Sequence, residues 1–436
     1  MSPRNSEGSR PTRRGLVRAA AGLAAVAGAG LGVSGVAEAL VETKSGAAAT
    51  NDAKSAVEPF WGKHQGGITT PVQGHTYVAA LDLQAAKRDD LIGLLRGWTA
   101  AAARMATGHS AEPIGQDAVV PGPDTGAALG LPPARLTVTF GFGAGLFVKD
   151  GKDRYGLATH RPPALVDLPR FNGDQLLDTR TGGDLSIQAC ADDPQVAFHA
   201  VRELVRLAYG AAEMRWAQTG FTADFGPKQT PRNLMGFKDG TNNPSADDPA
   251  MMGKFVWVGE EGPAWMQGGS YVVFRRIRMA LEHWDRMKVD FQEQTFGRHK
   301  YSGAPLGLKN EFDPLDLKAT DKDGNPVIPE SAHVRLAAAA SNDGAQILRR
   351  PYSYNDGVNF TAERWPPWRQ GMEYDAGLFF VCYQRDPRTG FIKIFDKMAK
   401  FDMLNQFVTH TGGGLFACPG GVAQGEFVGQ RLLETA

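Results

Sequence analysis

Short apolar runs alternate along the first half of the chain with stretches whose apolar residues recur every three to four positions. The runs predict strands at residues 76–83, 136–142 and 184–190, and the longer period predicts helices at residues 89–105 and 194–209. The order is strand, helix, strand, strand, helix. This order is typical of a ferredoxin-like α+β unit.

A similar order recurs in the second half. The expected elements are strands at residues 255–258, 270–277 and 378–383 and helical stretches at residues 280–294 and 391–408. Two similar halves indicate a duplicated ferredoxin-like α+β fold, and we place the two domains at residues 59–230 and 231–436. Between the helix and the last strand of the second half lies a loop at residues 301–331 that is broken repeatedly by Pro and Gly. Its length favours a functional loop over a simple connection.

The first 39 residues resemble a twin-arginine export signal. Arg13 and Arg14 precede a stretch rich in Ala, Gly and Val, and residues 37–39 form a small-x-small cleavage site. A membrane anchor is the alternative, but the stretch is short, rich in glycine and weakly hydrophobic. We therefore expect a signal peptide at residues 1–39 and export to the periplasm or the medium. Because this route carries folded proteins, we also expect a cofactor that is loaded before export. Residues 40–58 lack periodicity and predict a disordered linker.

Composition narrows the function classes. The chain has 436 residues, of which 42% are hydrophobic, and its 47 basic residues balance 47 acidic ones. Such a balance gives no indication of a nucleic acid or an anionic membrane as partner. The three cysteines show no Cys-x-x-Cys spacing, and the nine histidines form no zinc pattern. We expect at most one disulfide and no catalytic thiol.

Three separate segments carry the candidate chemistry. Asp239 lies in a turn between Gly236 and Gly240, a backbone suited to close approach, although surface turns also have this composition. His333 stands beside a small apolar run, where an imidazole needs a partner or a metal; a hydrogen-bonded core histidine is the alternative. Arg349 belongs to a strand-like segment with paired arginines, which more often lie on solvated faces.

Together these segments resemble the dye-decolourising peroxidases, specifically the exported subgroup that includes the deferrochelatase-like proteins. The resemblance rests on Asp239 in residues 236–241, His333 in residues 332–335 and Arg349 in residues 347–354. It extends over about residues 60–430 and includes further matches at residues 64–71, 182–188, 190–194, 296–300, 303–306 and 378–380.

The resemblance implies a fold of the dimeric α+β barrel type with one non-covalent haem b in the C-terminal half. His333 would be the iron ligand, with Asp402 accepting a hydrogen bond from its far nitrogen. Asp239 and Arg349 would be catalytic residues over the other haem face. Further haem contacts would come from Gly240, Thr241, Asn242, Arg298 (to a propionate), Leu378 and Phe380.

The chain departs from the family pattern at one place. Family members often carry an Asn-Pro-Arg-like segment shortly after the ligand histidine, whereas this chain has four alanines at residues 337–340. One propionate anchor is therefore in doubt, but the axial ligand is not.

The implied activity is a haem-dependent peroxidase that uses hydrogen peroxide to oxidise phenolic or anthraquinone-type donors in one-electron steps. Asp239 would move a proton between the peroxide oxygens, and Arg349 would stabilise negative charge on the departing oxygen. Because a free aspartic acid has a pKa of about 3.9, we expect an optimum at roughly pH 4 to 5. The alternatives are a deferrochelatase that releases iron from haem and a non-catalytic haem carrier.

The expected partners are hydrogen peroxide, small aromatic reductants and the twin-arginine translocation machinery, with a homodimer left open. Large donors would need electron transfer through surface aromatic residues. The candidates are Trp216, Trp257, Trp265, Tyr352, Tyr354 and Tyr374.

Overall fold

The computed structural model describes residues 55–115, 119–223, 229–362 and 370–434. The predicted signal peptide and most of the predicted linker therefore lie outside the described residues. Among the helices that are described, none combines the length and the apolar character needed to cross a membrane.

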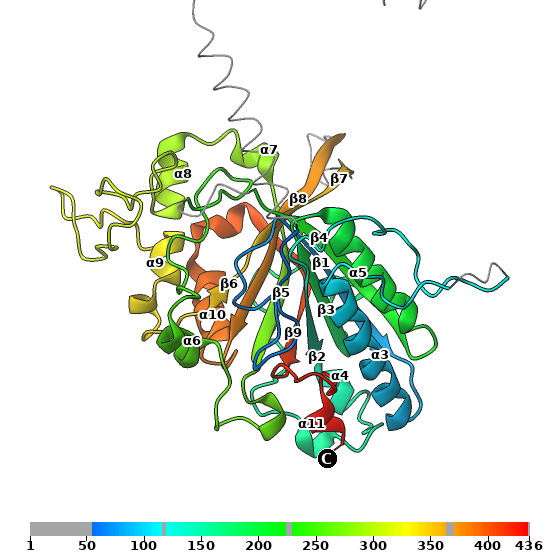
Figure 1. The fold of residues 1–436 in the computed structure, drawn as a ribbon. Helices are drawn as coiled ribbons and strands as arrows, with labels where there is room; N and C mark the ends of the chain where they lie inside the picture. Colours follow the sequence, from blue (N-terminus) through cyan, green and yellow to red (C-terminus); the bar gives the residue numbers. More distant parts are fainter. Residues whose placement is uncertain (1–54, 116–118, 224–228, 363–369, 435–436) are drawn as a thin grey trace, which may run out of the picture. The chain divides into compact units, whose positions relative to one another are not determined.

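The first half forms a four-stranded antiparallel unit with two long helices (Figure 1). Its main elements are β1 (His75–Leu83), α3 (Arg88–Ala106), β2 (Thr137–Phe142), β3 (Leu185–Ala191), α5 (Pro194–Leu207) and β4 (Ala212–Phe221). The strand order is β2-β3-β1-β4. Helix α5 starts sharply because Asp193 accepts hydrogen bonds from the backbone N–H groups of Gln195 and Val196, and Pro194 occupies the first helical position.

The second half repeats this plan with longer insertions. Its main elements are β5 (Ser270–Met279), α7 (Leu281–Trp284), α8 (Val289–Phe296), α9 (His333–Ala337), β6 (Leu348–Arg349), β7 (Tyr352–Ala362), β8 (Gln370–Gln384), α10 (Phe391–Phe401) and β9 (Val408–Cys418). Strands β6 and β7 pair with consecutive stretches of β8, which pairs in turn with β5, and β5 pairs with β9.

The remaining elements are short. The α-helices are α4 (Ala144–Phe147), α6 (Pro249–Phe255) and α11 (Gln430–Leu433). The 3₁₀ turns are η1 (Ala158–His160), η2 (Asp178–Arg180), η3 (Ala264–Met266), η4 (Ala339–Ser341) and η5 (Met403–Gln406).

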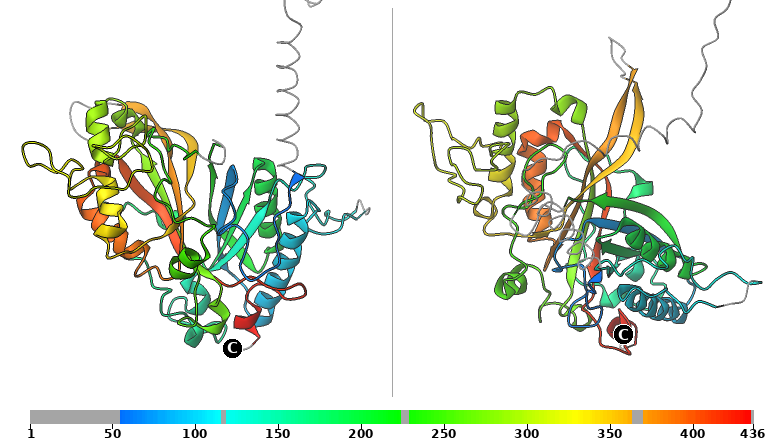
Figure 2. Two further views of the ribbon diagram at one scale, coloured as in Figure 1. Left: turned by 60° about the vertical axis from the view of Figure 1, so that its left-hand side comes forward. Right: turned by 45° about the horizontal axis from the view of Figure 1, so that its top comes forward.

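The two halves join into one closed barrel of strands. Phe142 of β2 pairs with Ala417 of β9, and Phe221 of β4 pairs with Ser353 of β7. Within the described residues, the nine strands thus form a single sheet closed by the pairing of β5 with β8. Helices α3 and α5 cover the outside of the first half, and α10 lies against the second (Figure 2). The duplicated ferredoxin-like prediction is confirmed.

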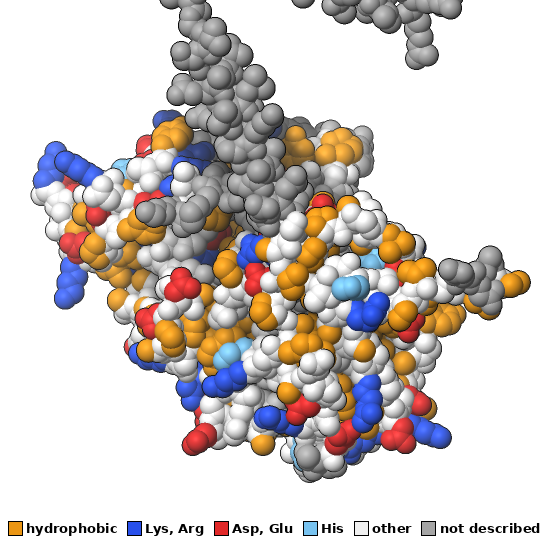
Figure 3. Space-filling view, viewed as in Figure 1, with side chains coloured by type: hydrophobic (Ala, Val, Ile, Leu, Met, Phe, Trp, Pro, Cys, Tyr) orange, Lys and Arg blue, Asp and Glu red, His pale blue; other side chains and the backbone are white. Residues whose placement is uncertain are grey.

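Alternation along the strands separates two cores. Val78 and Ala80 of β1 point into the barrel, where they join Phe274 and Tyr383 from the second half. Ala79, between them, faces the helices and joins a separate apolar cluster. This period of two is what a strand buried on both faces requires. On the face shown in Figure 3, basic and acidic side chains are interspersed.

Several element boundaries differ from the sequence prediction. The strand predicted at residues 255–258 is wrong, because Asp248 and Pro249 start α6, which ends at Phe255. The single helix predicted at residues 280–294 is two helices, α7 and α8. The helix predicted at residues 391–408 ends at Phe401, because Asp402 has an extended backbone and caps η5. Strands β4 and β9 were missed, the latter because its run of glycines obscures the apolar pattern.

The three cysteines of the chain, Cys190, Cys382 and Cys418, all lie in described residues. Each is buried and none is in a disulfide. Burial raises the pKa values of the Cys382 and Cys418 thiols far above their usual range. These two thiols therefore behave as apolar core groups rather than as nucleophiles.

Candidate functional site

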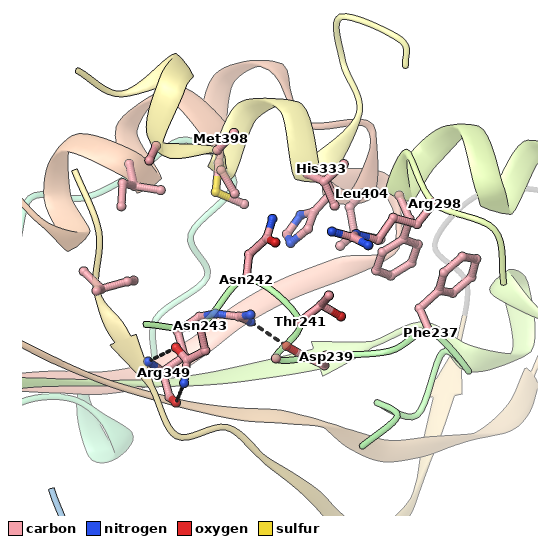
Figure 4. Close-up of a pocket in the computed structure, with 18 of the residues that line it drawn as sticks. Phe237, Asp239, Thr241, Asn242, Asn243, Arg298, His333, Arg349, Met398 and Leu404 are labelled. Atoms are coloured by element: carbon pink, nitrogen blue, oxygen red, sulfur yellow. Dashed lines mark hydrogen bonds and ion pairs between the residues drawn. The ribbon is translucent and has the colours of Figure 1, made fainter. Parts of the chain in front are cut away.

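A cavity of about 960 Å³ lies in the second half of the chain. Its walls are formed by the turn around Asp239, helices α9 and α10, and the floor strands β5, β8 and β9. Figure 4 shows His333 and Arg298 along one side of this cavity and Asp239 and Arg349 along the other. All the candidate residues line it: Asp239, Gly240, Thr241, Asn242, Arg298, His333, Arg349, Leu378, Phe380 and Asp402.

His333 is the first residue of α9, and a carboxylate holds its ring. His333 Nδ1 lies 2.7 Å from Asp402 Oδ2, and Asp402 Oδ1 accepts the backbone N–H of Leu404 at 2.8 Å. Burial lowers the pKa of His333, but the adjacent Asp402 charge raises it more, so that the net pKa lies above the ordinary value. Since the carboxylate only accepts, Nδ1 carries the proton of the neutral ring, and Nε2 is left with a lone pair for a ligand.

On the opposite side, Asp239 and Arg349 form an ion pair. Arg349 Nη1 donates to Asp239 Oδ1 at 2.5 Å, while Asp239 Oδ2 accepts no hydrogen bond from the described residues. The side chain of Asn243 makes two hydrogen bonds to the backbone of Arg349. Its oxygen accepts from Arg349 N, and its nitrogen donates to Arg349 O, each at 2.8 Å. The pair therefore presents a free carboxylate oxygen beside a fixed positive charge.

Arg298 provides a second cation at the cavity wall. Its Nη1 donates to the backbone oxygens of Gly303 at 2.7 Å and Glu311 at 2.9 Å. Arg298 is only 5% exposed. Burial lowers its pKa, and the charge of Glu311 raises it by less, so that the net pKa lies below the ordinary value. No described residue accepts from Nη2 or Nε, so this arginine retains donors for an anionic group.

The remaining walls are largely apolar. Leu378 and Phe380 alternate along β8 and face the cavity beside Ile277 and Met279 of β5. The alanines at residues 337–340 also line the cavity and offer no polar side chain there. This stretch of the wall therefore provides no polar side chain to hold a propionate.

Sequence reasoning missed three residues that line this cavity or contact its walls. Asn243 could have been suspected from the Asn242–Asn243 pair, but Glu311 and His410 carried no local signal. Glu311 reaches the Asp239 turn from the long loop. His410 lines the cavity, and its Nδ1 accepts from Arg275 Nε at 3.1 Å.

The aromatic residues suggested for electron transfer lie mostly in the interior. Trp216, Trp265, Tyr352 and Tyr354 are buried, and Trp257 is half-buried against His64. Tyr374, on β8, is 51% exposed. Of the six candidates, only Tyr374 is in the surface position that the hypothesis requires.

The residues present fit a haem group. A large, mostly apolar cavity suits the porphyrin, one imidazole nitrogen is free to bind iron, and the Arg298 donors suit a propionate. The opposing carboxylate and guanidinium can handle a proton and a developing negative charge. Fold and site together define a haem-binding α+β barrel equipped for peroxide chemistry.

Comparison with known proteins agrees with this class. The family models for the N-terminal and C-terminal parts of Dyp-type peroxidases match residues 65–222 and 230–423. A dye-decolorizing peroxidase of Thermobifida fusca is 40% identical over all of both chains. A deferrochelatase of Escherichia coli is 36% identical over 97% of each chain. The chain belongs to the Dyp-type peroxidase family.

The solved structures give the same result. Ferric DtpA from Streptomyces lividans is 43% identical and aligns over 87% of this chain and 98% of its own, with a TM-score of 0.78. The protein is therefore a haem peroxidase whose cofactor is haem b. The family prediction, the peroxidase prediction and the cofactor prediction are confirmed.

Proposed function

We propose that His333 is the iron ligand of the haem and that Asp239 and Arg349 are its catalytic pair. The observation that carries this proposal is the placement of the Asp239–Arg349 ion pair across the cavity from His333 (Figure 4), whose Nδ1 lies beside Asp402. Further residues that line the cavity would hold the haem and exclude water from the site. Arg298, Gly240, Thr241 and Asn242 would contact it, and Leu378 and Phe380 would keep its surroundings apolar. When bound, the haem supplies the iron centre and the electrons that cleavage of peroxide requires.

Asp239 acts on the protons of hydrogen peroxide. Its free Oδ2 takes a proton from one peroxide oxygen and delivers it to the other, which then leaves as water. Oδ1 stays bonded to Arg349 throughout, so the carboxylate keeps its orientation during the transfer. Asp239 is 14% exposed and therefore acts in a partly dry site, where directional proton transfer is efficient.

Arg349 acts through its fixed charge. Negative charge develops on the departing oxygen as the bond breaks, and a guanidinium held in place beforehand stabilises it, an effect worth roughly 3 to 4 kcal/mol for a single well-placed donor. The contacts from Asn243 to its backbone hold Arg349 ready without further reorganisation.

The test is a stopped-flow record of the haem-loaded protein mixed with hydrogen peroxide. Asp239→Asn and Arg349→Leu are each expected to slow the Soret change by about 100-fold or more while haem remains bound. Asp316→Asn, which replaces an exposed carboxylate at the cavity rim, is the matched control. An Asp239→Asn variant that reacts as fast as the unchanged protein would remove the proposed role.

We propose phenolic and anthraquinone-type compounds as the reducing substrates. Support comes from the apolar cavity walls and from the relative of Thermobifida fusca, which is named a dye-decolorizing peroxidase. Steady-state oxidation of an anthraquinone dye and of a substituted phenol, each with peroxide, tests the assignment. Rapid reaction with peroxide but no turnover of either compound would contradict it.

Release of iron from haem is a second candidate. It is favoured by the 36% identity to a protein named deferrochelatase over 97% of each chain. Incubation of the haem-loaded protein with a reductant and an iron chelator, followed by chromatography of the pigment, distinguishes the two activities. Metal-free protoporphyrin supports iron release, and unchanged haem contradicts it.

We also propose that residues 1–39 direct export by the twin-arginine route to the periplasm or the medium. The motif around Arg13 and Arg14 and the small residues at 37–39 support this. Mass spectrometry of the exported protein should give an N-terminus at Leu40, and replacing both arginines with lysine should abolish export.

A homodimer is proposed alongside, and light scattering of the mature protein tests it.

A further inference from the structure

The turn that carries Asp239 is held at both ends by its own backbone. Asp239 N donates to Pro231 O at 2.8 Å, and Asn243 N donates to Gly240 O at 2.9 Å. At its centre, Gly240 has a φ of +134°, which residues with a side chain rarely adopt. Glycine has wide conformational freedom, so the centre of the turn needs support from elsewhere.

Glu311 supplies that support from the long loop at residues 301–331. Its Oε2 accepts from Lys238 Nζ, and its Oε1 accepts from Thr241 Oγ1 at 3.0 Å. One carboxylate thus joins the residue before Asp239 to the second residue after it. The Glu311 side chain is 10% exposed, which protects both contacts from competing water.

The charge of Glu311 is maintained in this position. Burial raises its pKa, but hydrogen bonds from Lys238, Thr230 and Thr241 lower it more, so that the net pKa lies below the ordinary value. The carboxylate is therefore ionised at neutral pH and in mild acid. An ionised carboxylate binds the lysine and the hydroxyl more strongly than a neutral group would.

The loop is itself anchored, at its start and at Glu311. Arg298, which faces the cavity, donates to the backbone oxygen of Glu311 at 2.9 Å. At the start of the loop, Arg232 donates to Lys300 O at 2.6 Å, to Tyr301 O at 2.7 Å and, within the turn, to Gly236 O at 2.7 Å. The bonds from Arg232 join the start of the loop to the turn, and the bond from Arg298 holds the loop backbone at Glu311 itself.

We propose that Glu311 is a positioning residue that holds residues 238–241 so that Asp239 meets Arg349. It touches neither peroxide nor haem and acts through the orientation of the Asp239 carboxylate. The inference rests on the proposed role of Asp239.

The first experiment measures the peroxide step in the haem-loaded full chain. Glu311→Ala is expected to slow it by about 10- to 100-fold, because small displacements of a catalytic group are costly. Glu311→Gln keeps the shape and an acceptor for Thr241 but loses the charge that binds Lys238, so a smaller loss is expected. Asp323→Asn, an exposed carboxylate on the same loop with no contact to the turn, is the control and should react normally.

A double variant separates failure of this inference from failure of the proposed function. If Glu311 acts through Asp239, then Glu311→Ala should add no further loss in an Asp239→Asn background. An undiminished rate in Asp239→Asn alone would sink the role of Asp239 instead. Equal losses in both backgrounds, or a normal rate in Glu311→Ala, would overturn the positioning role.

A readout that does not depend on activity is hydrogen exchange in the haem-free protein. Glu311→Ala and Glu311→Gln are expected to speed exchange of the backbone amides at residues 236–243, with the protection of β5 unchanged. Asp323→Asn should leave both regions as they are. Unchanged exchange of the turn in both Glu311 variants would show that the contact does not hold it.

Discussion

At the scale of single residues, the site depends on carboxylates whose two oxygens have different tasks. Asp402 uses Oδ2 for His333 and Oδ1 for the backbone of Leu404, so it is fixed while it orients the ring. Asp239 uses Oδ1 for Arg349, and its Oδ2 accepts no hydrogen bond from the part of the chain that the structure describes. One carboxylate is thus fully engaged and serves as support, and the other is half engaged and is available for proton transfer.

The support role of Asp402 gives a spectroscopic prediction. Asp402→Asn removes the negative charge beside His333 Nδ1. With His333 as the proposed iron ligand, this change makes the imidazole a weaker donor to iron. We expect a more positive ferric/ferrous potential, with about 10- to 100-fold lower metal affinity or activity. A redox titration measures the potential. The control is Asp396→Asn, an exposed residue of α10 paired with Lys400, and a potential equal to the control would contradict the prediction.

The buried His410 predicts lower stability in mild acid. Burial, and then the adjacent charge of Arg275, lower its pKa well below 6.5. The unfolded chain therefore binds a proton near pH 6.5 that the folded chain does not, and stability falls as pH drops below that value. The slope from this group reaches at most about 1.4 kcal/mol per pH unit.

Urea unfolding of the haem-free protein between about pH 7 and pH 5 tests this dependence. His410→Gln retains an acceptor for Arg275 but cannot be protonated, so its stability should fall less steeply in this range. Equal slopes in the two proteins would show that His410 does not carry the effect.

At the scale of elements, sequence patterns predicted those turns and strands that depend mainly on neighbouring residues in the chain. Asp239 and Arg349 lie in segments that the sequence predicted to be a turn and strand-like, whereas the short helix that begins at His333 was not predicted. The strands with clear apolar runs, such as those around residues 78 and 274, were also predicted. The convergence of Asp239, His333 and Arg349 on one cavity was predicted from the family resemblance alone. No local pattern determines contacts between segments that are far apart in the chain.

Strand β9 and the contact of Glu311 were missed because neither has a clear local signal. Strand β9 contains Gly412, Gly413 and Gly414, which are needed where other chain segments pass close: a Cβ at Gly413 would lie 1.9 Å from Phe274 O. Glu311 was missed because its partners, Lys238 and Thr241, are about 70 residues away in the chain. Tertiary contacts of this kind do not appear in periodicity or turn chemistry.

The close pairing of β8 with β5 gives a prediction at this scale. A Cβ at Gly377 would lie 2.0 Å from Ile277 O, so Gly377→Ala must push the two strands apart. We expect a loss of about 1 to 3 kcal/mol in the free energy of unfolding. Leu378, the next residue, should move with the strand and alter the cavity floor. Urea unfolding measures the loss.

Gly371→Ala is the matched control, on the same strand. No described residue lies within 4 Å of a Cβ built at Gly371, so the change should stay within about 0.5 kcal/mol of the unchanged protein. Similar losses in the two variants would indicate a general effect of removing glycine from β8 rather than a clash with β5.

At the scale of the whole described fold, the two halves form one sheet and one interior core. Arg350, the neighbour of Arg349 in the chain, reaches into the first half, where its guanidinium donates to the backbone oxygen of Thr70 and to the side chain of Gln73. Burial lowers the pKa of Arg350, but the surrounding groups raise it more, so this buried charge stays positive. The interior of the barrel likewise combines side chains from both halves. The first half thus supports the strand that places Arg349.

This shared core predicts that the halves unfold together. Trp98 in α3 lies in the first half and Trp284 in α7 lies in the second. Both are buried, at 1% and 0% exposure, so each becomes exposed when its own half unfolds. In the haem-free protein, calorimetry should give one transition whose measured enthalpy equals the van't Hoff value. Residues 231–436 produced alone should show no cooperative transition, because the barrel pairings of β2 with β9 and β4 with β7 are lost. Two separated transitions, or a second half that binds haem by itself, would mean that the halves are independent domains and that Arg349 needs no support from the first.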